Sequence, residues 1–240
     1  MAQGTFNAWI NPLAFLPLDQ PGPTDSGTPS PQDFLAYMCA TGQSADPAEL
    51  AKRYKEIAKE PVQLFAVPAE QRILDKLIWP LRHAKASYVL GNHVGTIALC
   101  GMVAEMVTML LFDLASVQIN GQPMDDKRQE AVFGREFEKL DQSRRVHVLF
   151  AYGIIDDTAR QNFDLIRTTR RKYLHLWSQD HEALPGDAVK VYHASVSLVA
   201  RAIGQGVAEG AVALNPALVK YLEKAGIYTP KPEPSSEGAV

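Results

Sequence analysis

Apolar residues recur every three or four positions along most of the chain, the spacing that places side chains on one face of a helix. This pattern, with capping residues and first-turn prolines at the starts, predicts helices over residues 46–57, 68–91, 92–114, 125–145, 156–177, 185–203 and 215–222. Pro80 inside the second helix predicts a kink, and residues 147–152 form a separate short apolar piece. No stretch shows sustained alternation or a two-residue hairpin signal, so we expect an all-α fold with little or no sheet.

Residues 94–114 are apolar on nearly every face of their predicted helix, with Glu105 as the interruption. A helix of about 20 apolar residues is long enough to cross a bilayer, so a membrane span and a core helix both fit the length. An acidic residue at mid-span is costly in lipid, and no basic residues flank either end. We therefore expect a buried core helix and no membrane association.

Both ends of the chain differ in composition from the helical part. Six prolines fall between positions 12 and 31, and residues 229–240 are rich in Pro, Ser and Glu, so we expect a flexible segment over 1–31 and a disordered tail. Residues 32–228 then form one helical domain, which suits 240 residues of which 46% are hydrophobic. Residues 1–51 contain no Lys or Arg, so the basic start of a secretory signal is missing and we expect a cytoplasmic protein.

The charge and the missing motifs exclude several classes of function. A net charge of −3 and a pI near 6.1 argue against a general nucleic-acid coat, so any site for a polyanion must be local. The sequence has no phosphate-binding Gly-Lys-Ser/Thr loop, no Gly-rich dinucleotide turn and no Cys-x-x-Cys pair, and His181-Glu182 lacks the second His of a zinc-protease helix. We therefore expect neither a metal site nor a cofactor.

The predicted helix over residues 157–177 carries an unusual placement of charge. Phe163, Ile166 and Tyr173 share one side of this helix, and Arg170 falls in the middle of their apolar stripe. A guanidinium at this position must meet a carboxylate, a carbonyl, an anion or water, because burying it unpaired is costly.

Further basic residues surround Arg170 on the same helix. His175 follows five residues later near the predicted helix end, and Arg167 and Arg171 add positive charge that would attract an anion such as a phosphodiester. A structural interpretation stays open beside this one. In it, Arg170 pairs with a core acid such as Glu105, and His175 donates a hydrogen bond at the helix end.

Two segments of the sequence resemble the HEPN superfamily, all-α domains found in prokaryotic toxins, defence proteins and other RNA-processing proteins. The first, AKASYVLGNHVGTIALCGMVAEMVTMLL over residues 84–111, is similar to its pattern of a helix, a short Gly turn and a long apolar helix with an acidic residue. The second, GIIDDTARQNFDLIRTTRRKYLHLW over residues 153–177, is similar to its motif of Arg, four to six residues, then His, here Arg170 to His175. The resemblance covers roughly residues 68–204. The residue after the Arg is usually small and polar in that superfamily, and here it is Arg171.

The resemblance implies an antiparallel helical bundle that forms a homodimer, with the motif of each protomer facing a shared cleft. In active members this cleft is a metal-independent ribonuclease site. The motif would make Arg170 and His175 catalytic, while the residue types suit Arg167 and Arg171 to phosphate binding and Glu105 to a supporting role. The resulting hypothesis is a toxin or defence component that acts on RNA, with an antitoxin or regulatory partner. The alternative, favoured by Arg171, is a non-catalytic dimerisation or regulatory module in which Arg170 is a structural ion pair.

Overall fold

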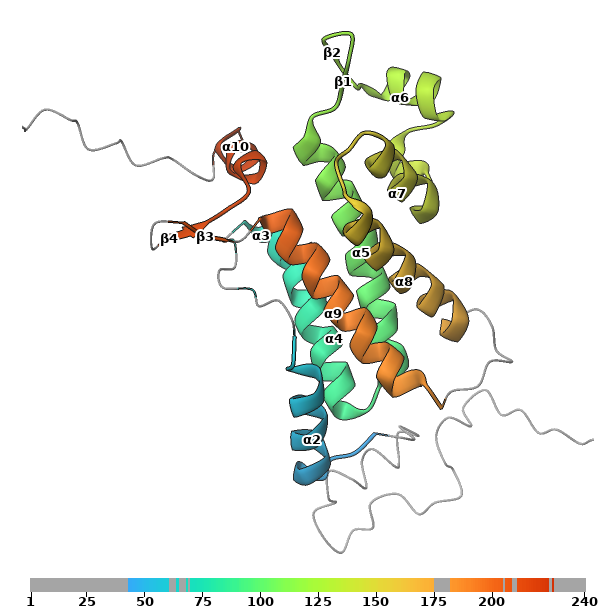
Figure 1. The fold of residues 1–240 in the computed structure, drawn as a ribbon, viewed down its shortest axis with the longest axis vertical. Coiled ribbons are helices and arrows are strands. Elements are labelled where there is room, and N and C mark those ends of the chain that lie inside the picture. Colours follow the sequence, from blue (N-terminus) through green and yellow to red (C-terminus); the bar gives the residue numbers. More distant parts are fainter. Residues whose placement is uncertain are drawn as a thin grey trace, which may run out of the picture.

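The computed structural model describes residues 43–60, 64, 68, 70–174, 182–204, 206–208, 211–224 and 226, and this part of the chain is mostly helical (Figure 1). Its helices are α2 Pro47–Ile57, α3 Gln71–Ile73, the π-helical η1 Leu74–Ile78, α4 Trp79–Leu90, α5 His93–Ala115, α6 Asp126–Phe133, the 3-10 turn η2 Phe137–Lys139, α7 Gln142–Ala151, α8 Asp157–Leu174, α9 Leu184–Ile203 and α10 Pro216–Lys224. The helical class predicted from the sequence is confirmed. The segment 1–31 and the tail 229–240 lie outside the described residues.

Helix α5 is the centre of the helical core. It contacts α4, α7, α8, α9, α10 and η1, and α4, α8 and α9 lie alongside it (Figure 1). Its most deeply buried apolar side chains are Ile97, Cys100, Val103, Ala104 and Val107. By length and composition alone, α5 could cross a membrane. Half of its most apolar 18-residue stretch is buried inside the protein. Eleven of the 23 residues of α5 are buried, so this helix supplies a large part of the core.

Capping side chains begin two of the long helices where the sequence predicts their starts. The Asn92 side chain accepts a hydrogen bond from the Gly95 N–H at 2.8 Å and begins α5, directly after Gly91 ends α4 in the left-handed conformation. The Asp156 carboxylate accepts a hydrogen bond from the Ala159 N–H at 2.9 Å and begins α8. These local signals fix where α5 and α8 begin.

The irregularity expected at Pro80 takes the form of a π-helical turn. The backbone N–H of Trp79 donates to the carbonyl of Leu74, five residues earlier, instead of four. Proline has no N–H to donate, and its ring crowds the carbonyl four residues before it, so a wider turn just ahead of Pro80 relieves the crowding. The helix predicted to start near Pro68 begins at Gln71, where the Glu70 carboxylate accepts a hydrogen bond from the Ile73 N–H at 2.8 Å.

The single helix predicted over residues 125–145 is wrong, because the structure breaks it into α6, η2 and the start of α7. Gly134, with a φ of 81°, ends α6 in the left-handed conformation. The Asp141 carboxylate then accepts a hydrogen bond from the Arg144 N–H at 3.0 Å and begins α7. The short apolar piece predicted over 147–152 is therefore the second half of α7 rather than a separate element.

The expectation of little sheet is confirmed, but the statement that no hairpin signal exists is wrong. Strands β1 Gln118–Ile119 and β2 Gln122–Pro123 pair antiparallel around Asn120 and Gly121, whose φ values are 51° and 73°. Asn-Gly is the residue pair that favours such a two-residue turn, because both positions need positive φ. A second antiparallel pair joins β3 Gly206–Ala208 to β4 Ala211–Ala213.

Candidate functional site

Arg170 on α8 and Glu105 on α5 form an ion pair between the two helices. The Nη1 of Arg170 donates a hydrogen bond to Oε1 of Glu105. The side chains are 34% and 31% exposed, so solvent reaches both charges. Each residue interrupts an otherwise apolar helix face, and the pairing gives both charges a partner at the α5–α8 contact. The structure thus brings together two of the predicted site residues that are 65 positions apart in sequence.

Gly101, one turn before Glu105 on α5, makes room for the Arg170 side chain. A β-carbon at position 101 would lie 2.6 Å from Cδ and 3.2 Å from Nε of Arg170, and the first of these distances is shorter than van der Waals contact permits. Glycine inside a helix usually costs stability, so its presence at a buried helix position indicates a packing or functional reason. Here the glycine lets the guanidinium reach Glu105 across the surface of α5.

Arg167 and Arg171 lie close to Arg170 along α8 but meet different surroundings. Arg167 donates from Nη2 to Oδ1 of Asp164 at 3.1 Å, a pairing within one helix turn. Arg171 is exposed and has no ion pair within the described part of the chain. The three arginines with Glu105 and Asp164 make a group of five side chains that carries one positive charge in excess, and this charge is that of Arg171.

Two buried N–H groups of the site have no hydrogen-bond partner among the described residues. They are the Nε atoms of Arg167 and Arg170. Leaving a buried donor unsatisfied costs about 1–3 kcal/mol.

A hydrogen-bond chain extends the site from α5 to α7. Thr108 donates to the backbone carbonyl of Glu105 at 2.7 Å, and Arg145 donates from Nη1 to the Thr108 hydroxyl at 3.4 Å. Arg145, only 9% exposed, also donates from Nε to the carbonyl of Leu140 at 3.0 Å. The turn of α5 that carries Glu105 is thereby tied to the start of α7.

Sequence reasoning missed Gly101 and Arg145. A glycine in the middle of an apolar helix is a signal that could have identified the first of them. Arg145 gave no such signal, because its predicted helix is polar throughout and its burial depends on how α7 packs against α5.

His175, the second residue of the predicted Arg and His motif, lies outside the described residues, since α8 ends at Leu174. The structure therefore gives the geometry of Arg170, Arg167, Arg171 and Glu105 but not of His175. Within the described part of the chain, no three His, Cys, Asp or Glu side chains lie close enough together to hold a metal ion. The arrangement that is described can hold an anion through guanidinium groups.

None of the protein families, curated proteins or solved structures compared with this chain matches it.

Proposed function

We propose that this chain is a HEPN-like antiparallel helical bundle, forms a homodimer in the cytoplasm, and acts on RNA as a metal-independent endoribonuclease. In this role it is a toxin or defence component controlled by an antitoxin or another regulatory protein. The observation that carries the proposal is the partly exposed Arg170, oriented by Glu105 on the central helix. The sequence motif adds His175 on the segment that follows α8.

The exposure of Arg170 supports a role in anion binding. About a third of its side chain is open to solvent, so a phosphate can approach it without the protein opening. Glu105 binds Nη1 and fixes the direction of the guanidinium, while the other edge remains available for a second acceptor. Arg171, exposed on the next position of α8, would bind a neighbouring phosphate.

The chemistry that suits these residue types is cleavage of RNA by its own ribose. His175 would take the proton from a ribose 2′-OH, and the 2′-oxygen would attack the adjacent phosphorus. The bond from phosphorus to the 5′-oxygen of the next nucleotide would break, leaving a 2′,3′-cyclic phosphate, and the leaving oxygen would take up a proton. Arg170 would stabilise the negative charge that develops on the phosphate oxygens.

A second candidate function is a non-catalytic helical dimer that serves as an interaction or regulatory module. The ion pair between Arg170 and Glu105 favours it, because the guanidinium already has an acidic partner. Arg171, which stands where a small polar residue is usual in the HEPN motif, favours it as well. In this function Arg170 holds α5 and α8 together and binds no substrate.

The test incubates wild-type protein and the variants His175→Ala and Arg170→Ala with a mixed RNA substrate in EDTA, followed by end-group analysis of the fragments. We expect wild-type protein to leave cyclic phosphate, and each variant to lose at least about a hundredfold in rate, the usual size of such contributions. Arg160→Ala is the matched control, because Arg160 lies on the same helix and pairs with Asp157 at 2.8 Å on the surface.

Unchanged cleavage by His175→Ala would remove this site from consideration. Absence of cleavage by wild-type protein on every RNA offered, together with a stable dimer in sedimentation, would favour the second candidate. Loss of activity in Arg160→Ala as strong as in Arg170→Ala would show that the assay reports the charge of α8 rather than a defined site.

A further inference from the structure

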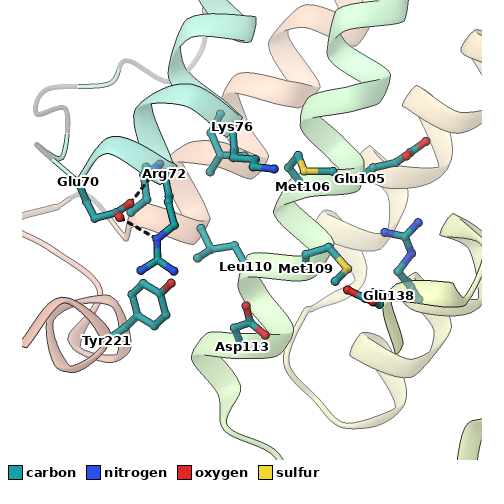
Figure 2. Close-up of a pocket in the computed structure, with 13 residues that line it drawn as sticks. Glu70, Arg72, Lys76, Glu105, Met106, Met109, Leu110, Asp113, Glu138 and Tyr221 are labelled. Carbon is teal, nitrogen blue, oxygen red and sulfur yellow. Dashed lines mark hydrogen bonds and ion pairs between the residues drawn. The ribbon is translucent and has the colours of Figure 1, made fainter. Parts of the chain in front are cut away.

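A cavity of about 480 Å³ lies beside α5, on the side formed by α3, η1, η2, α7 and α10 (Figure 2). Its volume is within the range of small-molecule sites in proteins. The apolar part of its lining consists of Ile73, Leu77, Met106, Met109 and Leu110. Methionine side chains adapt to ligands of different shape, and η1, which supplies Leu77, is a π-helical turn of the kind often found at functional sites.

Two carboxylates at one end of the cavity have no basic partner. Asp113 and Glu138 both line it, and neither has an ion pair with any residue in the described ranges. Figure 2 shows both at the end of the cavity away from Lys76. Removal of water raises the pKa of Asp113, and the charge of Glu138 adds to this effect while the charge of Arg72 opposes it. A cation between the two carboxylates would relieve their repulsion.

A buried guanidinium lines the same cavity. Arg145 is 9% exposed, and its two hydrogen bonds go to the Leu140 carbonyl and to the Thr108 hydroxyl. A guanidinium has five N–H donors. The remaining donors of Arg145 have no partner among the residues that the structure describes, and they can hold a carboxylate bidentately.

Three other charged groups of the lining, Glu70, Arg72 and Glu105, are already paired. Glu70 accepts from Nε of Arg72 at 2.9 Å, and Arg72 lies over the ring of Tyr221 at 5.3 Å. Glu105 pairs with Arg170 on the other side of α5, and Figure 2 shows its carboxylate turned away from the exposed Lys76. Asp113 and Glu138 are exposed carboxylates at the cavity that have no ion pair in the described ranges, and Arg145 is a buried guanidinium with spare donors. These three groups can bind a ligand that carries both a positive and a negative charge.

We infer that this cavity binds a free α-amino acid with an apolar side chain. Its ammonium group lies between Asp113 and Glu138, its carboxylate binds Arg145, and its side chain packs against Met106, Met109 and Leu110. Such a molecule has three parts, and each has a counterpart in the cavity. The two unpaired carboxylates match its ammonium group, the spare guanidinium donors match its carboxylate, and the apolar wall matches its side chain. This binding site does not depend on the proposed action on RNA.

The experiment titrates the full chain with leucine, methionine and phenylalanine by calorimetry, and with two analogues of leucine. One analogue, 4-methylpentanoate, lacks the ammonium group, and the other, 3-methylbutylamine, lacks the carboxylate. We expect at least one of the three amino acids to bind, and each leucine analogue to bind at least about tenfold more weakly than leucine, because either the two carboxylates or the guanidinium of Arg145 then lose a charged partner. The double variant Asp113→Asn, Glu138→Gln should weaken leucine binding by about the same factor, whereas Asp126→Asn, an exposed control on α6, should not.

Methionine methyl resonances locate the ligand independently of any substitution. Signals of Met106 and Met109 should shift on titration, and that of Met102, which is 41% exposed and does not line the cavity, should not. No binding of any of the three amino acids, equal binding of leucine and 4-methylpentanoate, or a shift confined to Met102 would overturn the inference.

Discussion

The side chain of Arg170 crosses α5 at Gly101, where no β-carbon fits beneath it. The separation of 2.6 Å between Cδ of Arg170 and a β-carbon at position 101 means that any larger residue must displace the arginine. Gly101 thus determines whether Arg170 can reach Glu105 at all. It is a positioning residue for the ion pair, because it acts only through the room it leaves.

The first prediction concerns Gly101→Ala. In the wild-type background we expect it to destabilise the protein by about 1 kcal/mol, because the cost of displacing Arg170 exceeds the gain in helix propensity. In an Arg170→Ala background the same substitution should stabilise by about 0.5–1 kcal/mol, since only the propensity gain remains. Urea unfolding of the four proteins measures both values. Gly186→Ala on α9, where a β-carbon meets nothing within 4 Å, is the control and should not depend on Arg170.

The second prediction concerns the strength of the pair between Arg170 and Glu105. A double-mutant cycle with Arg170→Ala and Glu105→Ala should give a coupling of about 1 kcal/mol, because both side chains are about one-third exposed. The coupling should fall in roughly 1 M salt. The surface pair of Arg160 and Asp157 on α8 is the comparison, with an expected coupling below about 0.5 kcal/mol. A coupling of about 3 kcal/mol or more, unaffected by salt, would instead indicate a structural pair and favour the non-catalytic module.

The third prediction is a dependence of stability on pH that arises from Glu70. Burial raises the pKa of this carboxyl, but hydrogen bonds from the Arg72 side chain and the Ile73 N–H outweigh burial, so the pKa lies below its ordinary value. The unfolded chain therefore binds this proton more readily, and the stabilisation is present above about pH 4.5 and is lost as the pH falls through the lowered pKa.

Glu70→Gln removes this dependence. We expect it to cost about 1 kcal/mol at pH 7, the usual value of a helix cap, and progressively less as the pH falls below about 4.5. Urea midpoints at several pH values measure the difference between the two proteins. Glu130→Gln, the same change of charge at an exposed position on α6, should show no such convergence. A difference that stays constant down to about pH 3 would contradict the prediction.

The fourth prediction concerns the attachment of α2 to α4. The buried Tyr88 donates its hydroxyl hydrogen bond to Oε2 of Glu56 at 2.9 Å, and burial together with this carboxylate raises the pKa of Tyr88 to about 12. Tyr88→Phe should cost about 1–2 kcal/mol in thermal unfolding, because a bond to a charged acceptor is lost. Tyr54→Phe, at a side chain 54% exposed, should cost less than about 0.5 kcal/mol. Equal effects of the two substitutions would show that the bond contributes nothing.

The parts of the fold that sequence predicted well are those fixed by neighbouring residues. Asn92 and Asp156 cap α5 and α8 through their own backbone turns, so their positions in sequence suffice to place the helix starts. The break at Gly134 was missed because α6 buries none of its residues and so leaves no apolar stripe whose end could be recognised. Asn120 and Gly121 are a local signal of the same kind, because Asn-Gly favours a two-residue hairpin turn.

The residues of the candidate site also differ in how far the sequence alone predicts them. The pairing of Arg170 with Glu105 was among the alternatives because each charge lies on an apolar helix face and needs a partner. The cavity beside α5 could not be predicted, since its walls come from η1, η2, α7 and α10, which meet only through tertiary packing. The buried donors of Arg145 depend on the same packing.

The π-helical turn over Leu74–Ile78 behaves like a single inserted residue. An extra residue in one turn rotates the part of the helix that follows by about 100° relative to the part that precedes it. Arg72, which precedes the turn, lines the cavity, whereas Leu81 and Tyr88, which follow it, are buried in the core. A chain one residue shorter here would rotate one of these faces away from its neighbours.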